Sequence, residues 1–230
     1  MEFPEGSIYA HIFRRIMHIL LSFAVVYYLL PYTIFSLPRE VWMLSILIGT
    51  PAIVEYIRIR KGKLVPGLRE HESSHVASYF WFLTGTAITL WIFPQSIAAP
   101  MVVAAAIGDP VIGEFRELRR RYWMTLGIIV CSLPFFLYGY SPVMAIVSGT
   151  ITFLAESVHI EVKWTFRDSL FRSRSKGHVH PLAEKLRIHT LLDDDFLMLL
   201  IPSAILLIIY TNMPWLFPPP RVTPAVAKYP

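Results

Sequence analysis

Residues 96–115, with the sequence SIAAPMVVAAAIGDPVIGEF, decide the fold class of this chain. A run of about twenty mostly apolar residues is long enough for a helix to cross the hydrocarbon core of a bilayer. Comparable runs occur at residues 12–36, 40–57, 76–93, 124–140, 142–158 and 196–211. The sequence therefore predicts an all-α protein, a polytopic transmembrane helical bundle of about seven spans.

The amino-acid composition is also that of a membrane protein. Hydrophobic residues make up 55% of the 230 residues and charged residues only 16%, which is too apolar for a soluble domain of this length. The net charge of +5 is explained by basic loops beside apolar spans, so we expect no nucleic-acid binding. The single cysteine, Cys131, lies in an apolar run and cannot form an internal disulfide.

The distribution of lysine and arginine predicts the orientation in the membrane. All but Arg39, Arg221 and Lys228 of the 21 basic residues lie on the side that holds the N-terminus. Positive charge is retained on the cytosolic side, so we expect an N-in, C-out integral membrane protein with every long loop in the cytosol.

The domain organisation is simple. A single transmembrane helical domain is predicted for residues 1–213, with a long basic cytosolic loop at 159–192, followed by a Pro-rich external tail at 214–230. The first apolar run follows acidic residues and is too long for a signal peptide, so we expect it to be retained. Tight turns are predicted at 36–39, 94–96 and 139–142.

Four carboxylates stand near the cytosolic ends of apolar runs: Glu55, Asp109, Glu114 and Glu156. A carboxylate that faced lipid would cost a few kcal/mol, so these side chains should face protein, water or a ligand. The alternative for each one is solvation at the membrane edge. Their grouping on one face favours a shared site.

Other charged residues are expected at the same depth. Three consecutive aspartates head the last span, Asp193, Asp194 and Asp195. Their oxygens suit magnesium, although they would also serve as a helix N-terminal cap. Cations come from Arg14, Arg15, Arg116 and the run 119–121, which suit phosphates or act only as a topogenic signal. Metal-holding acids beside phosphate-binding arginines indicate a nucleotide or phosphoryl-transfer site.

Several short motifs, taken in order, carry a resemblance to a known family. They are Arg14-Arg15-Ile16-Met17-His18, Glu55-Tyr56-Ile57-Arg58, Leu68-Arg69-Glu70-His71-Glu72, Gly108-Asp109-Pro110, Ala155-Glu156-Ser157 and Leu192-Asp193-Asp194-Asp195-Phe196. Over about residues 14–205 the sequence resembles the CTP-dependent polyprenol kinases, which include dolichol kinase and phytol kinase. The family's Lys-Thr-Glu-Gly-Ser element has no counterpart after Asp109, and Asp195 stands where the family has Asn.

The resemblance implies transfer of a phosphoryl group from CTP to an isoprenoid alcohol at the cytosolic face. It implies magnesium at Asp109 and at the three aspartates Asp193, Asp194 and Asp195. It also implies that Arg14, Arg15, Arg116 and Gly108 bind the nucleotide. Candidates for orienting or deprotonating the alcohol, beside Asp109, are Glu156, Glu70 and His18. The expected partners are the alcohol, CTP and membrane lipids, while the oligomeric state is not set by the sequence.

Three other functions compete with the kinase. Residues 71–75, His-Glu-Ser-Ser-His, satisfy the HExxH pattern of zinc proteases, in which both imidazoles share one helical face. A transporter or channel would also place carboxylates within a membrane, although it needs polar groups near the midplane. A CTP-dependent lipid cytidylyltransferase would share the nucleotide, the metal and the topology.

Overall fold

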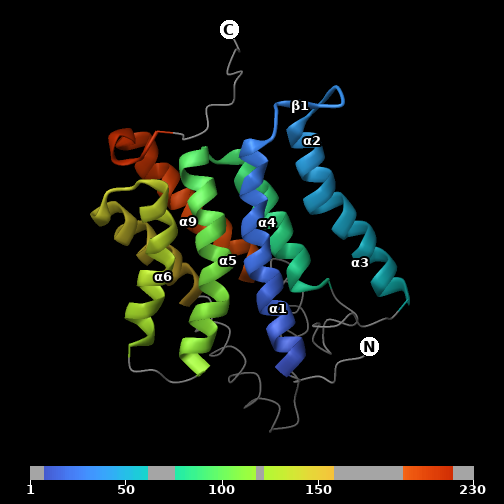
Figure 1. Ribbon diagram of the computed structural model, residues 1–230, viewed down its shortest axis with the longest axis horizontal. Coiled ribbons are helices and arrows are strands. Elements are labelled where there is room, and N and C mark those ends of the chain that lie inside the picture. Colours follow the sequence, from blue (N-terminus) through green and yellow to red (C-terminus); the bar gives the residue numbers. More distant parts are fainter. Residues whose placement is uncertain (1–7, 62–75, 118–121, 158–193, 220–230) are drawn as a thin grey trace, which may run out of the picture.

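The computed structural model describes residues 8–61, 76–117, 122–157 and 194–219. This part is predominantly helical (Figure 1), which confirms the all-α prediction. Its helices are α1 (Ile8–Leu21), η1 (Ser22–Leu29), α2 (Arg39–Leu44), η2 (Ser45–Gly49), α3 (Thr50–Lys61), α4 (Ser78–Ile92), α5 (Gln95–Glu117), α6 (Trp123–Tyr138), the helix Pro142–Ser157, α9 (Asp194–Asn212) and η5 (Pro214–Leu216). Helix α1 continues into η1, and α2, η2 and α3 follow one another without a break.

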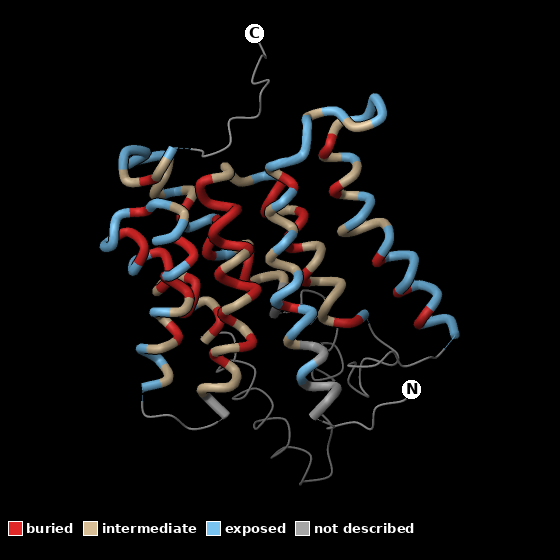
Figure 2. Tube along the Cα trace, viewed as in Figure 1, coloured by how far each residue is buried: buried red, intermediate tan, exposed pale blue. Residues whose placement is uncertain are grey.

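Helix α5 lies in the centre of the bundle (Figures 1 and 2). It packs against α1, η1, α4, α6 and α9, while α4 also packs against α9. Its small residues, such as Ala98, Ala104 and Ala105, let these neighbours approach closely. The largest side chains with no exposed surface include Phe82 of α4, Met101 of α5, Phe135 of α6 and Leu199 of α9. These residues belong to one core cluster around α5.

Helices α6 and Pro142–Ser157 form a tight antiparallel pair. Gly139 ends α6 with a φ of 108°, and the amide of Tyr140 donates to the carbonyl of Phe135. Glycine adopts this left-handed conformation without strain, and Pro142 then suits the first turn of the next helix. The predicted turn at 139–142 is therefore confirmed, as is the turn at 94–96 between α4 and α5.

The first connection differs from the prediction. We expected a helix as far as residue 36 and a turn at 36–39, but η1 ends at Leu29 and a β-hairpin follows, with β1 (Thr33–Ile34) paired to β2 (Leu37–Pro38). Leu30 precedes a proline and is extended, with ψ 145°, because the proline ring disfavours the helical conformation there. The hairpin turns at Phe35 and Ser36, whose φ values are both positive.

The two ends of the bundle differ in their connections (Figure 1). The hairpin, the turn at 93–94 and the turn at 139–141 lie at one end, here called the hairpin end. The described ranges stop or resume toward the other end, here called the polar end. These positions are Lys61, Val76, Glu117, Tyr122, Ser157 and Asp194. This alternation agrees with the predicted pattern of short and long connections.

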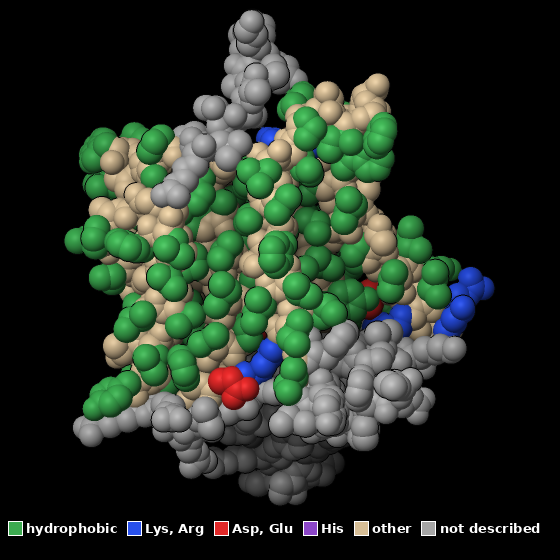
Figure 3. Space-filling model, viewed as in Figure 1, with side chains coloured by type: hydrophobic (Ala, Val, Ile, Leu, Met, Phe, Trp, Pro, Cys, Tyr) green, Lys and Arg blue, Asp and Glu red, His purple; other side chains and the backbone are tan. Residues whose placement is uncertain are grey.

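Two helices are long and apolar enough to cross a membrane, Arg39–Lys61 and Gln95–Phe115. The other apolar helices have 10–17 residues. In the most apolar 18-residue stretch of Gln95–Phe115, 72% is buried inside the protein. A position in the core therefore accounts for the apolar character of this helix. In the corresponding stretch of Arg39–Lys61, only 17% is buried, so most of its hydrophobic side chains face outward. Figure 3 shows hydrophobic side chains over most of the described surface in that view.

Candidate functional site

The charged side chains that the structure describes are divided unequally between the two ends. Arg39 and Glu40 lie at the hairpin end, where Arg39 covers the ring of Tyr27 at 4.7 Å and Tyr27 donates to Glu40. The others lie in the halves of their helices that are nearer the polar end: Arg15, Glu55, Arg58, Arg60, Lys61, Asp109, Glu114 and Glu156. In the described part of the chain, most ionisable side chains therefore lie toward the polar end, where the sequence predicts a site.

His18 and Asp109 meet between α1 and α5. The Nδ1 atom of His18 lies 3.2 Å from Oδ2 of Asp109. The His18 side chain is 8% exposed, whereas that of Asp109 is 39% exposed. The imidazole also packs on the ring of Phe82 in α4, with ring centroids 5.0 Å apart. Two candidate residues from distant parts of the sequence therefore lie in contact, and the carboxylate keeps an open side.

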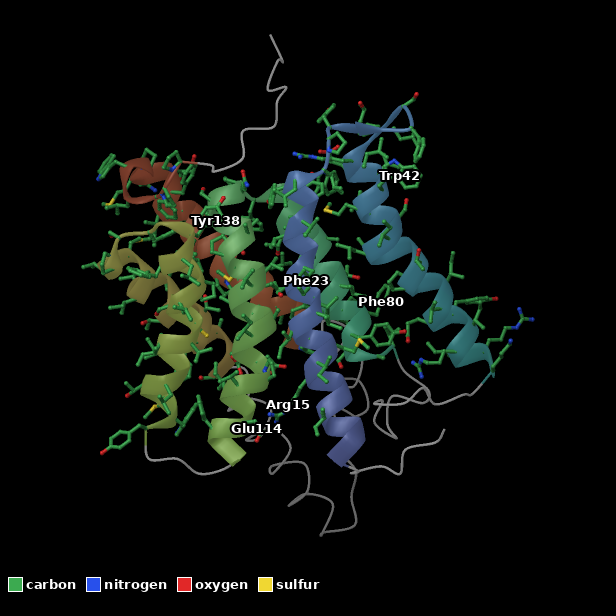
Figure 4. The ribbon with its side chains drawn as sticks, viewed as in Figure 1. Arg15, Phe23, Trp42, Phe80, Glu114 and Tyr138 are labelled. Carbon is green, nitrogen blue, oxygen red and sulfur yellow. The ribbon has the colours of Figure 1, made fainter. Side chains whose placement is uncertain are left out.

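Arg15 lies one turn before His18 and pairs with the same segment of α5. Its guanidinium forms an ion pair with Glu114 and donates to the carbonyl oxygen of Pro110 at 3.0 Å. Figure 4 shows the Arg15 and Glu114 side chains close together. The guanidinium also lies beside Gly113, where an added Cβ would be in ordinary van der Waals contact with it, 3.7 Å from Nη2. Arginine has five N–H donors, so these contacts leave further donors for a phosphate.

Glu156 lies in the last turn of the helix Pro142–Ser157. Its side chain is buried, with 6% of the residue exposed. A Cβ added at Gly108 would lie 4.0 Å from Oε2 of Glu156 and 3.0 Å from Sγ of Cys131. Gly108 therefore allows α6 and the helix Pro142–Ser157 to pack closely against α5. Its predicted contact with a nucleotide stays a prediction.

A second polar cluster joins α3 to α4. Arg58 donates from Nε and Nη2 to the two carboxylate oxygens of Glu55, at 2.9 and 2.7 Å. The same carboxylate accepts from the hydroxyl of Tyr79 at 2.5 Å and from the amide of Ala77 at 3.1 Å. Glu55 and Arg58 are 3% and 4% exposed. A buried ion pair is stable only when its remaining hydrogen bonds are satisfied in this way.

The structure brings some candidate residues together and does not describe others. His18 contacts Asp109, Arg15 contacts the neighbouring Pro110, and Glu156 lies beside Gly108. Glu70, Asp193 and the HExxH residues 71–75 lie outside the described ranges, and the side chains of Arg14, Arg116, Asp194 and Asp195 lie outside the described part as well. The start of α9 is nevertheless placed, because Phe196 packs on Trp81 of α4 with centroids 6.0 Å apart.

No cluster of metal ligands is formed by the described residues alone. Within those ranges, no three His, Cys, Asp or Glu side chains are grouped closely enough to hold an ion. Asp109 supplies oxygens of the kind that magnesium prefers, but the described donor set is incomplete. The predicted metal site depends on the aspartates at 193–195.

Comparison with known proteins does not identify a family. No protein-family model matches the chain, and no curated protein or solved structure matches it either. The likeness to polyprenol kinases therefore rests on the short motifs quoted above.

Three contacts of this site were not predicted from the sequence. Phe82, which supports the His18 ring, looks like any other apolar residue of its run. Glu114 was recognised as a misplaced acid, but not as the partner of Arg15. The Glu55–Arg58 pair did have a signal, because side chains three residues apart meet on a helix.

Proposed function

We propose that this chain is a multi-pass membrane protein whose seven helices cross the bilayer, with the polar end in the cytosol. The outward-facing hydrophobic side chains of Arg39–Lys61 support this topology, because large exposed apolar surfaces on a protein mark contact with lipid or with a partner. At 1.5 Å per residue this helix is about 34 Å long, enough to cross the hydrocarbon core. The unequal distribution of described charges supports the orientation.

We further propose that the protein is a lipid kinase that transfers a phosphoryl group from CTP to an isoprenoid alcohol at the polar end. The observation that carries this proposal is the contact between His18 and Asp109. It joins two of the motifs that resemble the kinase family, and Arg15 lies in the same place. Such a grouping of acid, base and arginine suits phosphoryl transfer.

Phosphoryl transfer requires the protein to position the reacting groups and to stabilise the charge on the phosphates. Magnesium, when bound, would neutralise phosphate charge, and Asp109 with the aspartates at 193–195 would hold it. The guanidinium of Arg15 would share its donors between Glu114 and a phosphate oxygen, assisted by Arg14 and Arg116. One of three residues would position the alcohol or accept its proton. They are Glu156, Glu70 and His18, of which His18 lies against Asp109.

The test uses purified full-length protein with an isoprenoid alcohol, magnesium and CTP labelled at the γ-phosphate. We expect label in the lipid, and we expect Asp109→Asn to abolish it while the variant remains folded. Glu40→Gln is the matched control, because Glu40 lies at the hairpin end. Normal activity in Asp109→Asn, or no label from any nucleotide, would exclude the proposal.

The same assay separates the competing functions. A cytidylyltransferase would transfer label from the α-phosphate of CTP to the lipid, and a kinase would transfer label only from the γ-phosphate. A transporter would give neither.

A further inference from the structure

Helix α3 lies at the edge of the described bundle, and most of it is exposed (Figures 1 and 2). Its buried residues are Pro51, Glu55 and Arg58, and Glu55 contacts α4 through the hydroxyl of Tyr79. These three residues are spaced four and three apart, so they share one face of the helix. The opposite face of α3 therefore points away from the bundle.

The outward face of α3 is an apolar stripe that ends in two cations. Ile46 of η2, and Ile53 and Ile57 of α3, are 61%, 63% and 44% exposed. Arg60 and Lys61, which are also exposed, follow Ile57 by three and four residues and so lie on the same side of the helix. At 1.5 Å per residue the stripe is about 21 Å long, more than the ~15 Å of hydrocarbon in one leaflet. It is long enough to support one acyl chain.

The two cations keep their positive charge within the described part of the chain. Glu55, the carboxylate of α3, is buried and forms its ion pair with Arg58. Arg60 instead donates to the hydroxyl of Tyr56 at 3.3 Å, and this contact orients the guanidinium without neutralising it. Because arginine has five N–H donors, others stay available for a phosphate, and Lys61 adds a second charge beside them. The end of the stripe therefore suits an anion.

We infer that this end of α3 binds one anionic phospholipid, with the phosphate on Arg60 and Lys61 and an acyl chain along Ile53 and Ile57. This inference rests on the proposed membrane topology and goes beyond the proposed reaction, because the phospholipid is a bound partner and not the substrate. A phospholipid carries its negative phosphate at one end of its acyl chains, as the stripe carries its cations at one end. Anionic lipids give the cytosolic leaflet its negative potential, and the proposed orientation places Lys61 at that leaflet.

The test measures lipid binding to the purified full-length protein in detergent by native mass spectrometry. The protein is titrated with dioleoyl-phosphatidylglycerol, which is anionic, or with dioleoyl-phosphatidylcholine, which has no net charge. We expect the first phosphatidylglycerol to bind about tenfold more tightly than phosphatidylcholine. Equal binding of the two lipids overturns the inference. Displacement of phosphatidylglycerol by millimolar inorganic phosphate also overturns it, because the cations would then bind a free phosphate.

Charge variants locate the bound lipid. Arg60→Gln together with Lys61→Gln removes both cations of the stripe and should weaken phosphatidylglycerol binding about tenfold. Arg221→Gln together with Lys228→Gln is the matched control, because it removes two cations that follow the last apolar run. This control should bind as the unmodified protein does. Equal binding by the two double variants contradicts the inference.

A third variant separates a defined site from a general attraction between lipid and positive charge. Tyr56→Phe keeps every charge and removes only the hydroxyl that accepts from Arg60. It should weaken phosphatidylglycerol binding about threefold, and unchanged binding would overturn the inference. Selective phosphatidylglycerol binding without phosphorylation of an alcohol would reject the kinase alone. Phosphorylation with equal binding of both lipids would reject the phospholipid site alone.

Discussion

Gly149, in the helix Pro142–Ser157, provides the sharpest test of the packing. A Cβ added there would overlap Oγ of Ser132 and would lie 2.5 and 2.6 Å from the backbone nitrogen and Cα of that residue. Backbone atoms cannot rotate away, so Gly149→Ala must push α6 and its partner helix apart. We expect a loss of about 2–3 kcal/mol in the free energy of unfolding, in the upper range for overpacked sites.

The assay is thermal unfolding of the purified protein in one detergent, followed by circular dichroism. For a chain of this size the expected loss lowers Tm by about 4–12 °C. Gly49→Ala is the matched control, because the nearest atom to a Cβ at Gly49 is 4.0 Å away. Alanine is the better helix former, so this change should leave Tm unchanged or raise it by about 1–3 °C.

A double variant separates the backbone overlap from the side-chain overlap. Ser132→Gly removes the hydroxyl but leaves the backbone nitrogen and Cα in place. It should therefore restore only part of the stability that Gly149→Ala removes. Complete rescue by Ser132→Gly, or equal Tm values for Gly149→Ala and Gly49→Ala, would refute the close approach of these two helices.

Three further predictions follow from the described contacts. Glu55→Ala leaves Arg58 buried and uncompensated, so it should cost about 3–5 kcal/mol of stability, and replacing both residues with alanine should cost less than the sum of the single changes in a thermal-unfolding cycle. Tyr140→Phe removes a buried hydrogen bond of 2.8 Å to a backbone carbonyl. It should cost about 1–3 kcal/mol by the same measurement, and no loss would mean that the bond is absent. A cysteine at Ser36 should react with an impermeant maleimide on intact cells, and one at Lys61 only after permeabilisation; the reverse pattern would reject the proposed topology.

The helices could be predicted from the sequence because each apolar run is bounded by charges, prolines or turn residues. Residues 124–140 and 142–158 were separated at Gly139 and Pro142, where the structure has a left-handed glycine and a new helix. The hairpin at 33–38 could not be predicted in this way. Thr33, Ser36 and Pro38 interrupt its apolar residues, but none of them predicts strand pairing, and only Pro31 marks the point where the helix ends.

The candidate site was predictable as a set of residues but not as a geometry. His18, Asp109 and Arg15 were each chosen for their chemistry, yet nothing in the sequence says that His18 contacts Asp109 or that Arg15 pairs with Glu114. These contacts depend on the rotation of α1 against α5, which the packing of the whole bundle determines. Local pairs such as Glu55 with Arg58 are predictable because the helix itself fixes their separation.

The covered arginine at the hairpin end has a consequence for biosynthesis. In the proposed topology, the hairpin end has to pass through the hydrocarbon layer during insertion, and each exposed ion would oppose that passage. Arg39 is 8% exposed, pairs with Glu40 and lies over the ring of Tyr27. If these contacts form early, this end crosses as a nearly neutral hairpin tipped by Phe35, while the charge-rich opposite end stays behind and sets the direction of assembly.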